Sequence, residues 1–135
     1  MKRAAVSVRY EGSAPYPSIV DTGAPWTFVP AHWLPHAVGG KPASMAVGGT
    51  VYRGRHARIR VELPSGITLV LPEAFVAEHP RADFGLLGTD FLQPAACRVD
   101  LRRHRLVCPQ GTEKLTELLP GNVAVTAAAR RRGAR

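Results

Sequence analysis

The sequence lacks long hydrophobic runs. No stretch approaches the roughly 20 consecutive apolar residues that a membrane-spanning helix needs, and the opening MKRAAVSVRYEG has basic residues but no apolar stretch of signal-peptide length. We therefore expect no membrane partner and a cytoplasmic location. Long helices are not expected either, because 12 prolines and 13 glycines interrupt the 135 residues. This length, with a hydrophobic content of 45%, is typical of one globular domain.

Cysteine is also scarce, with only Cys97 and Cys108. No Cys-x-x-Cys or His-x-His spacing accompanies them and the five histidines are scattered, so no metal is expected. The segment between the cysteines predicts a hairpin with a two-residue turn, in which Asp100 faces Arg105. The two cysteines then face each other with their Cα atoms about 5.5 Å apart. A disulfide could form there, but a cytoplasmic setting keeps thiols reduced, so we expect two buried, free cysteines.

Acidic residues are few, 10 against 18 basic ones, which gives a net charge of +8. Much of this excess lies in residues 127–135, which we predict to be a basic, disordered tail. The remaining arginines are spread along predicted strands without interleaved aromatic side chains that could stack on bases. We therefore do not expect a nucleic-acid partner, although a binder that uses the tail is an alternative. The same charge suits acidic peptides or protein partners equally well.

Alternating apolar residues and frequent turns predict an all-β fold. In residues 56–63, Ala57, Ile59, Val61 and Leu63 are expected to face inward, and residues 4–10 alternate in the same way. Further strands or extended pieces are expected at 18–20, 27–35, 67–72, 73–77 and 84–88, with a glycine-rich hairpin or loop at 38–50 and the cysteine hairpin at 97–108. Residues 89–93 predict one short helix with Thr89 as its N-cap, and residues 112–119 an optional second one.

Asp21 presents a physical problem. It follows the apolar run Ser18–Val20 and precedes Thr22, Gly23, Ala24 and Pro25, none of which is a cation. A carboxylate at the end of a buried strand is costly unless it is protonated, paired or hydrogen-bonded. A second, identical carboxylate that shares one proton with the first solves the problem without a cation. A single chain has one such motif, so the second copy must come from a symmetric partner.

The stretch IVDTGAPWTFVP, followed by FGLLGTDFL, resembles the signature pair of the retropepsin-like aspartic proteases, and of their single-lobe bacterial members in particular. The resemblance covers residues 4–108. It implies a small closed barrel in which the Asp-Thr-Gly loop is crossed from behind by a strand at Leu86–Gly88, forming a ψ-shaped loop that leads into a short helix. The glycine-rich segment AVGGTVYRG would form a flap hairpin.

The resemblance also implies the roles of individual residues. Asp21 from each subunit would form the catalytic pair, Thr22 would brace the two loops across the dimer axis, and Gly23 would let the backbone approach the substrate. The implied substrate-binding residues are Ala24, Trp26, Val47, Gly48, Gly49, Thr50, Tyr52 and Leu87. Gly48 and Gly49 would lie at or near the flap tip. For Trp26 core packing, and for Tyr52 a place on the strand surface, are the alternative interpretations.

Two departures concern the dimer. Retroviral members carry an acid where this chain has Pro25 and an arginine where it has Thr89, so the ion pair that braces the dimer is absent and the brace must differ. We expect residues 1–108 to form the protease domain, and residues 109–126 to form a C-terminal extension. This extension or the cysteine hairpin would supply the dimer contact.

The sequence therefore predicts an aspartic endopeptidase that acts as a homodimer on peptide or protein substrates, through water activated by two aspartates, without metal or organic cofactor. The alternative is a protease-like module that binds peptides or dimerises without hydrolysis. Both interpretations share the fold, and they differ in whether Asp21 turns over a peptide bond.

Overall fold

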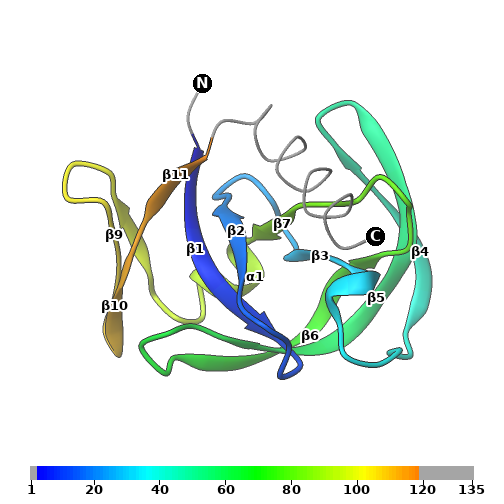
Figure 1. Cartoon of the computed structure of the whole chain (residues 1–135), viewed down its shortest axis with the longest axis horizontal. Helices are drawn as coiled ribbons and strands as arrows, with labels where there is room; N and C mark the ends of the chain where they lie inside the picture. Colours follow the sequence, from blue (N-terminus) through cyan, green and yellow to red (C-terminus); the bar gives the residue numbers. More distant parts are fainter. Residues whose placement is uncertain (1–2, 119–135) are drawn as a thin grey trace.

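The computed structural model describes residues 3–118, in which β-strands dominate (Figure 1). The strands are β1 (Arg3–Tyr10), β2 (Tyr16–Val20), β3 (Phe28–Pro30), β4 (Lys41–Val47), β5 (Thr50–Glu62), β6 (Thr68–Ala77), β7 (Gly85–Leu87), β8 (Arg98–Asp100), β9 (Arg105–Cys108), β10 (Gly111–Lys114) and β11 (Thr116–Leu118). A 3-10 turn, η1 (Ala31–Trp33), and a short helix, α1 (Thr89–Leu92), complete the described part. Within residues 3–118, the prediction of an all-β fold with one short helix is confirmed.

Two local predictions are wrong. The described part of the predicted second helix, residues 112–118, is not helical, because Gly111–Lys114 pairs with β9 and Thr116–Leu118 pairs with β1. Thr89 is not the N-cap of α1: Gly88 takes that position without a side-chain hydrogen bond, and the Thr89 hydroxyl donates to the Ala24 carbonyl at 3.2 Å. The pairing of β11 with β1 and the contact of Thr89 with Ala24 join residues distant in sequence, and they replace the local preference.

Most strands belong to an 8-stranded sheet with the order β11-β1-β2-β7-β3-β6-β5-β4. A further pairing joins β1 to β5 at Arg9–Glu62 and Tyr10–Val61, so that pairings lead from β1 through β2, β7, β3, β6 and β5 back to β1. In Figure 1 the long strands β5 and β6 curve around the base of the molecule and β1 stands across from them. The strongly curved sheet thus encloses a core.

The main core lies inside this curved sheet. The alternation predicted for β5 is confirmed, since Ala57, Ile59 and Val61 are buried in one cluster while Arg58 and Arg60 are exposed. A second cluster, which we call the hairpin-side cluster, consists of Ile19, Ala24, Phe28, Met45, Tyr52, Phe75, Ala77, Ala82 and Leu86. Neighbouring residues of β3 and β6 divide between the two clusters, with Phe28 and Phe75 on the hairpin side and Val29 and Val76 in the main core.

The cysteines form a disulfide, which corrects the prediction of free thiols. The predicted register is confirmed, with Asp100 opposite Arg105, but the turn spans Leu101 to His104 and is longer than predicted. The Cα atoms of Cys97 and Cys108 lie 4.1 Å apart, closer than the hydrogen-bonded separation that we expected. The bridge ties the segment after α1 to β9 in the smaller sheet, whose order is β10-β9-β8.

Residues 119–126 of the predicted C-terminal extension and all of the predicted basic tail lie outside the described residues. The start of the extension contributes β10 and β11, and β11 adds to the edge of the large sheet beside β1. Within residues 3–118, the structure contains no helix with the length and apolar character needed to cross a membrane.

Candidate functional site

Asp21 lies in the connection between β2 and β3, and a third strand passes between those two. β7 pairs in parallel with β2, where Val20 lies opposite Leu87, and in antiparallel with β3, where Phe28 lies opposite Leu86. The connection from β2 to β3 therefore passes over the end of β7 (Figure 1). The Asp21 backbone N–H donates to the Leu87 carbonyl at 3.0 Å, which fixes the start of this loop to β7.

The carboxylate of Asp21 is held by its own loop on one side. Gly23 donates its backbone N–H to Oδ1 at 2.9 Å, and a Cβ on Gly23 would lie 3.4 Å from that same oxygen. The Ala24 N–H donates to the Asp21 carbonyl at 3.2 Å and closes the turn. A quarter of the Asp21 side chain stays exposed, at 25%. The Asp-Thr-Gly sequence thus presents a partly open carboxylate on a compact turn.

A cation does lie beside Asp21, contrary to what its sequence neighbours suggest. Arg3, at the start of β1, places Nη2 3.7 Å from Oδ2 of Asp21. The pairing of β1 with β2, in which Ala5 lies opposite Ile19, brings the two residues together. The sequence interpretation missed this pair, because only the antiparallel register of β1 and β2 shows it.

The far end of the loop is held by a second carboxylate, on α1. Both oxygens of Asp90 accept the Thr27 backbone N–H at 2.9 Å, and Oδ1 also accepts the Thr27 hydroxyl at 2.7 Å. The Thr27 hydroxyl oxygen in turn accepts the Gly88 N–H at 3.1 Å. Burial raises the pKa of Asp90 above its usual range, and the hydrogen bonds from Thr27 only partly oppose this effect.

Gly88 lets α1 approach the loop closely. A Cβ at this position would lie 2.8 Å from the carbonyl oxygens of Ala24 and Trp26, both backbone atoms that cannot move aside cheaply. The Thr89 N–H donates to the Ala24 carbonyl at 2.8 Å across the same contact. The stretch from Leu86 to Gly88 therefore supports the Asp21 loop at both of its ends, through Leu87 at Asp21 and through Gly88 at Thr27.

The glycine-rich segment forms a regular hairpin of β4 and β5. Val47 lies opposite Thr50, and the two residues between them, Gly48 and Gly49, have φ angles of +56° and +83°. Consecutive positive φ angles are typical of the tight hairpin turns that glycine favours. The predicted hairpin is confirmed and its tip is assigned to Gly48 and Gly49.

The hairpin packs toward the Asp21 loop through its inward side chains. Met45 and Tyr52 share the hairpin-side cluster with Ile19 and Ala24, which flank Asp21 in sequence. The ring of Tyr52 makes edge contacts with Phe28 and Phe84, at centroid distances of 5.2 and 5.8 Å. Apolar side chains therefore extend from the hairpin to the residues that flank Asp21 in the chain.

The other predicted site residues differ in how far they are exposed. Thr22, Gly23 and Thr50 are exposed beside the loop or the hairpin tip, and Val47 packs partly against the hairpin-side cluster. Trp26 is 36% exposed and its ring contacts His56 of β5 in a tilted arrangement, with the ring centroids 4.7 Å apart, so it does not lie in either core. Leu87 is fully buried in the main core, so its backbone, rather than its side chain, reaches the loop.

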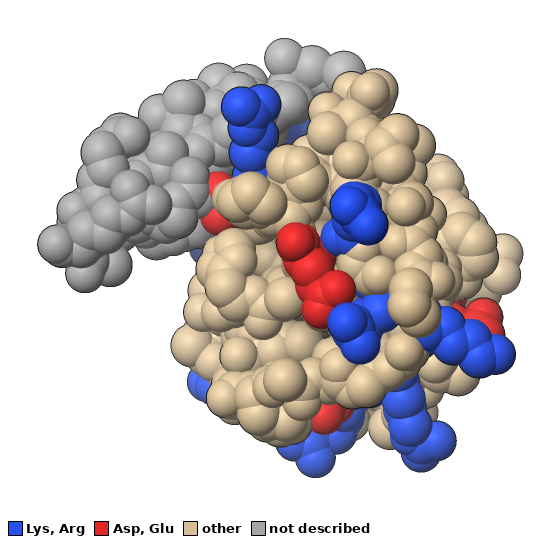
Figure 2. All heavy atoms as spheres, turned by 90° about the vertical axis from the view of Figure 1, so that its right-hand side faces the viewer, with Lys and Arg blue, Asp and Glu red and all other residues tan. Residues whose placement is uncertain are grey.

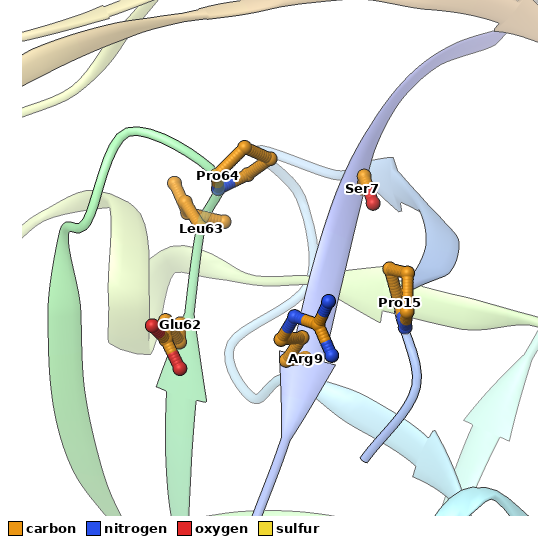
Figure 3. A pocket seen from close by; sticks show the side chains of 6 residues that line it. All are labelled: Ser7, Arg9, Pro15, Glu62, Leu63 and Pro64. Atoms are coloured by element: carbon orange, nitrogen blue, oxygen red, sulfur yellow. The ribbon is translucent and has the colours of Figure 1, made fainter. Parts of the chain in front are cut away.

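A separate hollow of about 410 Å³ lies near the C-terminal end of β1. Figure 3 shows Ser7 and Arg9 of β1 facing Pro15 on one side and Glu62, Leu63 and Pro64 on the other. Arg9 donates from Nη1 to the Ser13 carbonyl at 3.0 Å. The residues of the Asp21 loop do not line this hollow, so it is a distinct feature of the surface.

Charged residues are dispersed over the β4–β5 face. Figure 2 shows Lys and Arg side chains spread across this side of the molecule with acidic groups between them. Arg55 and Glu78, for example, form an ion pair with Nε and Oε2 at 3.0 Å. Among residues 3–118, no three His, Cys, Asp or Glu side chains are grouped so that they could hold a metal ion.

No protein-family model matches the chain, and no curated protein matches it either.

Proposed function

We propose that this protein is an aspartic endopeptidase that acts as a homodimer, with Asp21 of each chain in the catalytic pair. The observation that carries the proposal is the path of β7 between β2 and β3, with the Leu87 carbonyl accepting the Asp21 N–H. This arrangement holds an Asp-Thr-Gly turn at the surface and leaves its carboxylate partly open. A rigidly supported, accessible carboxylate is what acid–base catalysis requires.

The proposed chemistry uses two carboxylates that share one proton. Two carboxylates about 3 Å apart cannot both ionise easily, so one stays protonated. The ionised member takes a proton from water, whose oxygen attacks the peptide carbonyl carbon, while the protonated member donates to the carbonyl oxygen. Collapse of the tetrahedral intermediate breaks the C–N bond, and the leaving amine takes up a proton from the pair.

The described architecture supports a retropepsin-like fold. The pairing of β1 with β5 favours a closed barrel, the β2–β7–β3 arrangement favours the ψ-shaped loop, and the β4–β5 hairpin is in position to act as a flap. The hairpin-side cluster is apolar, so we propose that substrates place hydrophobic side chains on either side of the cleaved bond.

Mass spectrometry after incubation with a peptide library tests this proposal. Wild-type protein is expected to cleave a subset of peptides with hydrophobic side chains at the cut site, and Asp21→Asn is expected to cleave none while it unfolds at the same temperature. Cleavage by Asp21→Asn at the wild-type rate would refute the assignment. A stable wild-type dimer that binds peptides but cleaves none would favour the alternative, a binding or dimerisation module.

A further inference from the structure

Both oxygens of the Asp21 carboxylate are engaged within one chain. Oδ1 accepts the Gly23 N–H at 2.9 Å, and Oδ2 lies 3.7 Å from the guanidinium of Arg3. Among residues 3–118, the Arg3 side chain makes no other ion pair or hydrogen bond. The contact to Arg3 therefore occupies the oxygen that the Asp21 loop itself leaves open.

The backbone of Arg3 is fixed, but its side chain is accessible. Arg3 lies opposite Leu118 of β11, and Ala5, two residues further on, lies opposite Ile19 of β2. The Arg3 side chain is 36% exposed, and an ion pair this open to water is held weakly. Rotation of the arginine side chain alone can break the contact without disturbing the strands that position Asp21.

An arginine at this distance conflicts with the proposed catalytic pair. The two carboxylates of the proposed pair must approach to about 3 Å and keep one proton between them. The guanidinium occupies space beside Oδ2, where a second carboxylate or a water would have to approach. The state seen in one chain therefore differs from the state that the proposed reaction needs.

We propose that Arg3 restrains Asp21. Its side chain contacts the Asp21 carboxylate in the single chain and moves away when two chains bring their Asp21 side chains together. This inference rests on the proposed homodimer and adds a regulatory step to it. The ion pair to Arg3 competes with dimerisation, so the fraction of active protein depends on the strength of that pair as well as on protein concentration.

Sedimentation across a range of protein concentrations tests the competition without any substrate. Arg3→Gln is expected to lower the dimer dissociation constant by about two- to fivefold, the range that an exposed ion pair supports. Arg3→Lys keeps the charge and is expected to stay near the wild-type value. Arg9→Gln is the matched control, because it removes the same charge from the same strand but its guanidinium binds the Ser13 carbonyl instead.

The Asp21→Asn background shows whether the effect acts through Asp21. There, Arg3→Gln is expected to leave the dissociation constant unchanged, since the charge that Arg3 restrains is gone. The inference is overturned if Arg3→Gln weakens the dimer, or changes it no more than Arg9→Gln does. If the dissociation constants follow the expectation while no peptide is cleaved, the restraint stands and the proposed hydrolysis fails. If neither wild type nor Arg3→Gln dimerises at any concentration, both proposals are overturned.

Discussion

The carboxylate of Asp90 holds the backbone of Thr27, 63 residues earlier in the chain, and through it the loop that carries Asp21. Both Asp90 oxygens lie 2.9 Å from the Thr27 nitrogen, and the Thr27 hydroxyl bonds both to Asp90 and to the Gly88 N–H. Helix α1 therefore does more than follow β7 in the chain. It supplies the acid that connects the far end of the Asp21 loop to the strand behind it.

Removing this acid is expected to destabilise the protein. Asp90→Ala leaves the Thr27 N–H and hydroxyl without their acceptor, which costs about 1–3 kcal/mol of unfolding free energy. Asp90→Asn is the matched control, because its amide oxygen can still accept from Thr27. Urea unfolding at pH 7 measures both variants. Equal stability of Asp90→Ala and wild type would show that the contact contributes nothing.

The same residue predicts a pH dependence of stability. Burial raises the pKa of folded Asp90 above its ordinary value of 3.8. Between these two pKa values the folded chain holds a proton that the unfolded chain has lost, so the Asp90 contribution to stability falls as pH rises through that window. Unfolding free energies measured upward from about pH 4 are expected to show this fall in wild type and to lack it in Asp90→Asn. If the unfolding free energy of wild type instead rises with pH relative to that of Asp90→Asn, the account is contradicted.

Gly88 is expected to be intolerant of any side chain. The alanine Cβ would collide with backbone oxygens of the Asp21 loop at 2.8 Å, so Gly88→Ala must push the loop or α1 aside, at a cost of about 1–3 kcal/mol. Gly39→Ala is the control, because a Cβ there meets no atom within 4 Å. Thermal melts measure stability, and peptide cleavage is expected to fall further than stability alone explains. Indistinguishable melts for the two variants would contradict the close approach.

Tyr52 is expected to anchor the hairpin through its ring. It is 7% exposed and contacts Phe28, Phe84 and His79, whereas its hydroxyl makes no hydrogen bond within residues 3–118. Tyr52→Phe should therefore match wild type, and Tyr52→Ala should lose about 3 kcal/mol of stability and raise KM for peptides. Hydrogen exchange of the β4–β5 amides reports the loosened hairpin. Unchanged exchange in Tyr52→Ala would show that the ring is not an anchor.

The disulfide is expected to stabilise the fold by about 2–3 kcal/mol, because it closes a short loop between Cys97 and Cys108, which are 11 residues apart in sequence. Reductant should lower the melting temperature of wild type and leave that of the double variant Cys97→Ala, Cys108→Ala unchanged.

Alkylation of cysteines in intact cells tests the cytoplasmic location predicted from the sequence, since the cytosol keeps most thiols reduced. Quantitative labelling of both cysteines there would show that the bridge is open in the cell.

The sequence predicted the features that local pattern determines, and it missed those that depend on distant pairing. Alternation in β5 and the turn at Gly48 and Gly49 follow from residue type, and both are present. The contacts of Arg3 with Asp21 and of Asp90 with Thr27 depend on strand register and on the placement of α1. The cysteine register was predicted correctly, but the closer Cα separation and the disulfide were not.

A mixing experiment tests the central claim most directly, namely that one active site needs Asp21 from two chains. Folded Asp21→Asn protein is added in increasing amounts to a fixed, dilute concentration of wild type, and peptide cleavage is followed after subunit exchange. The account predicts that the rate falls toward zero, because mixed dimers carry only one carboxylate. A cleavage rate that stays constant as the variant reaches large excess would show that a single chain hydrolyses peptides alone, and would contradict the account.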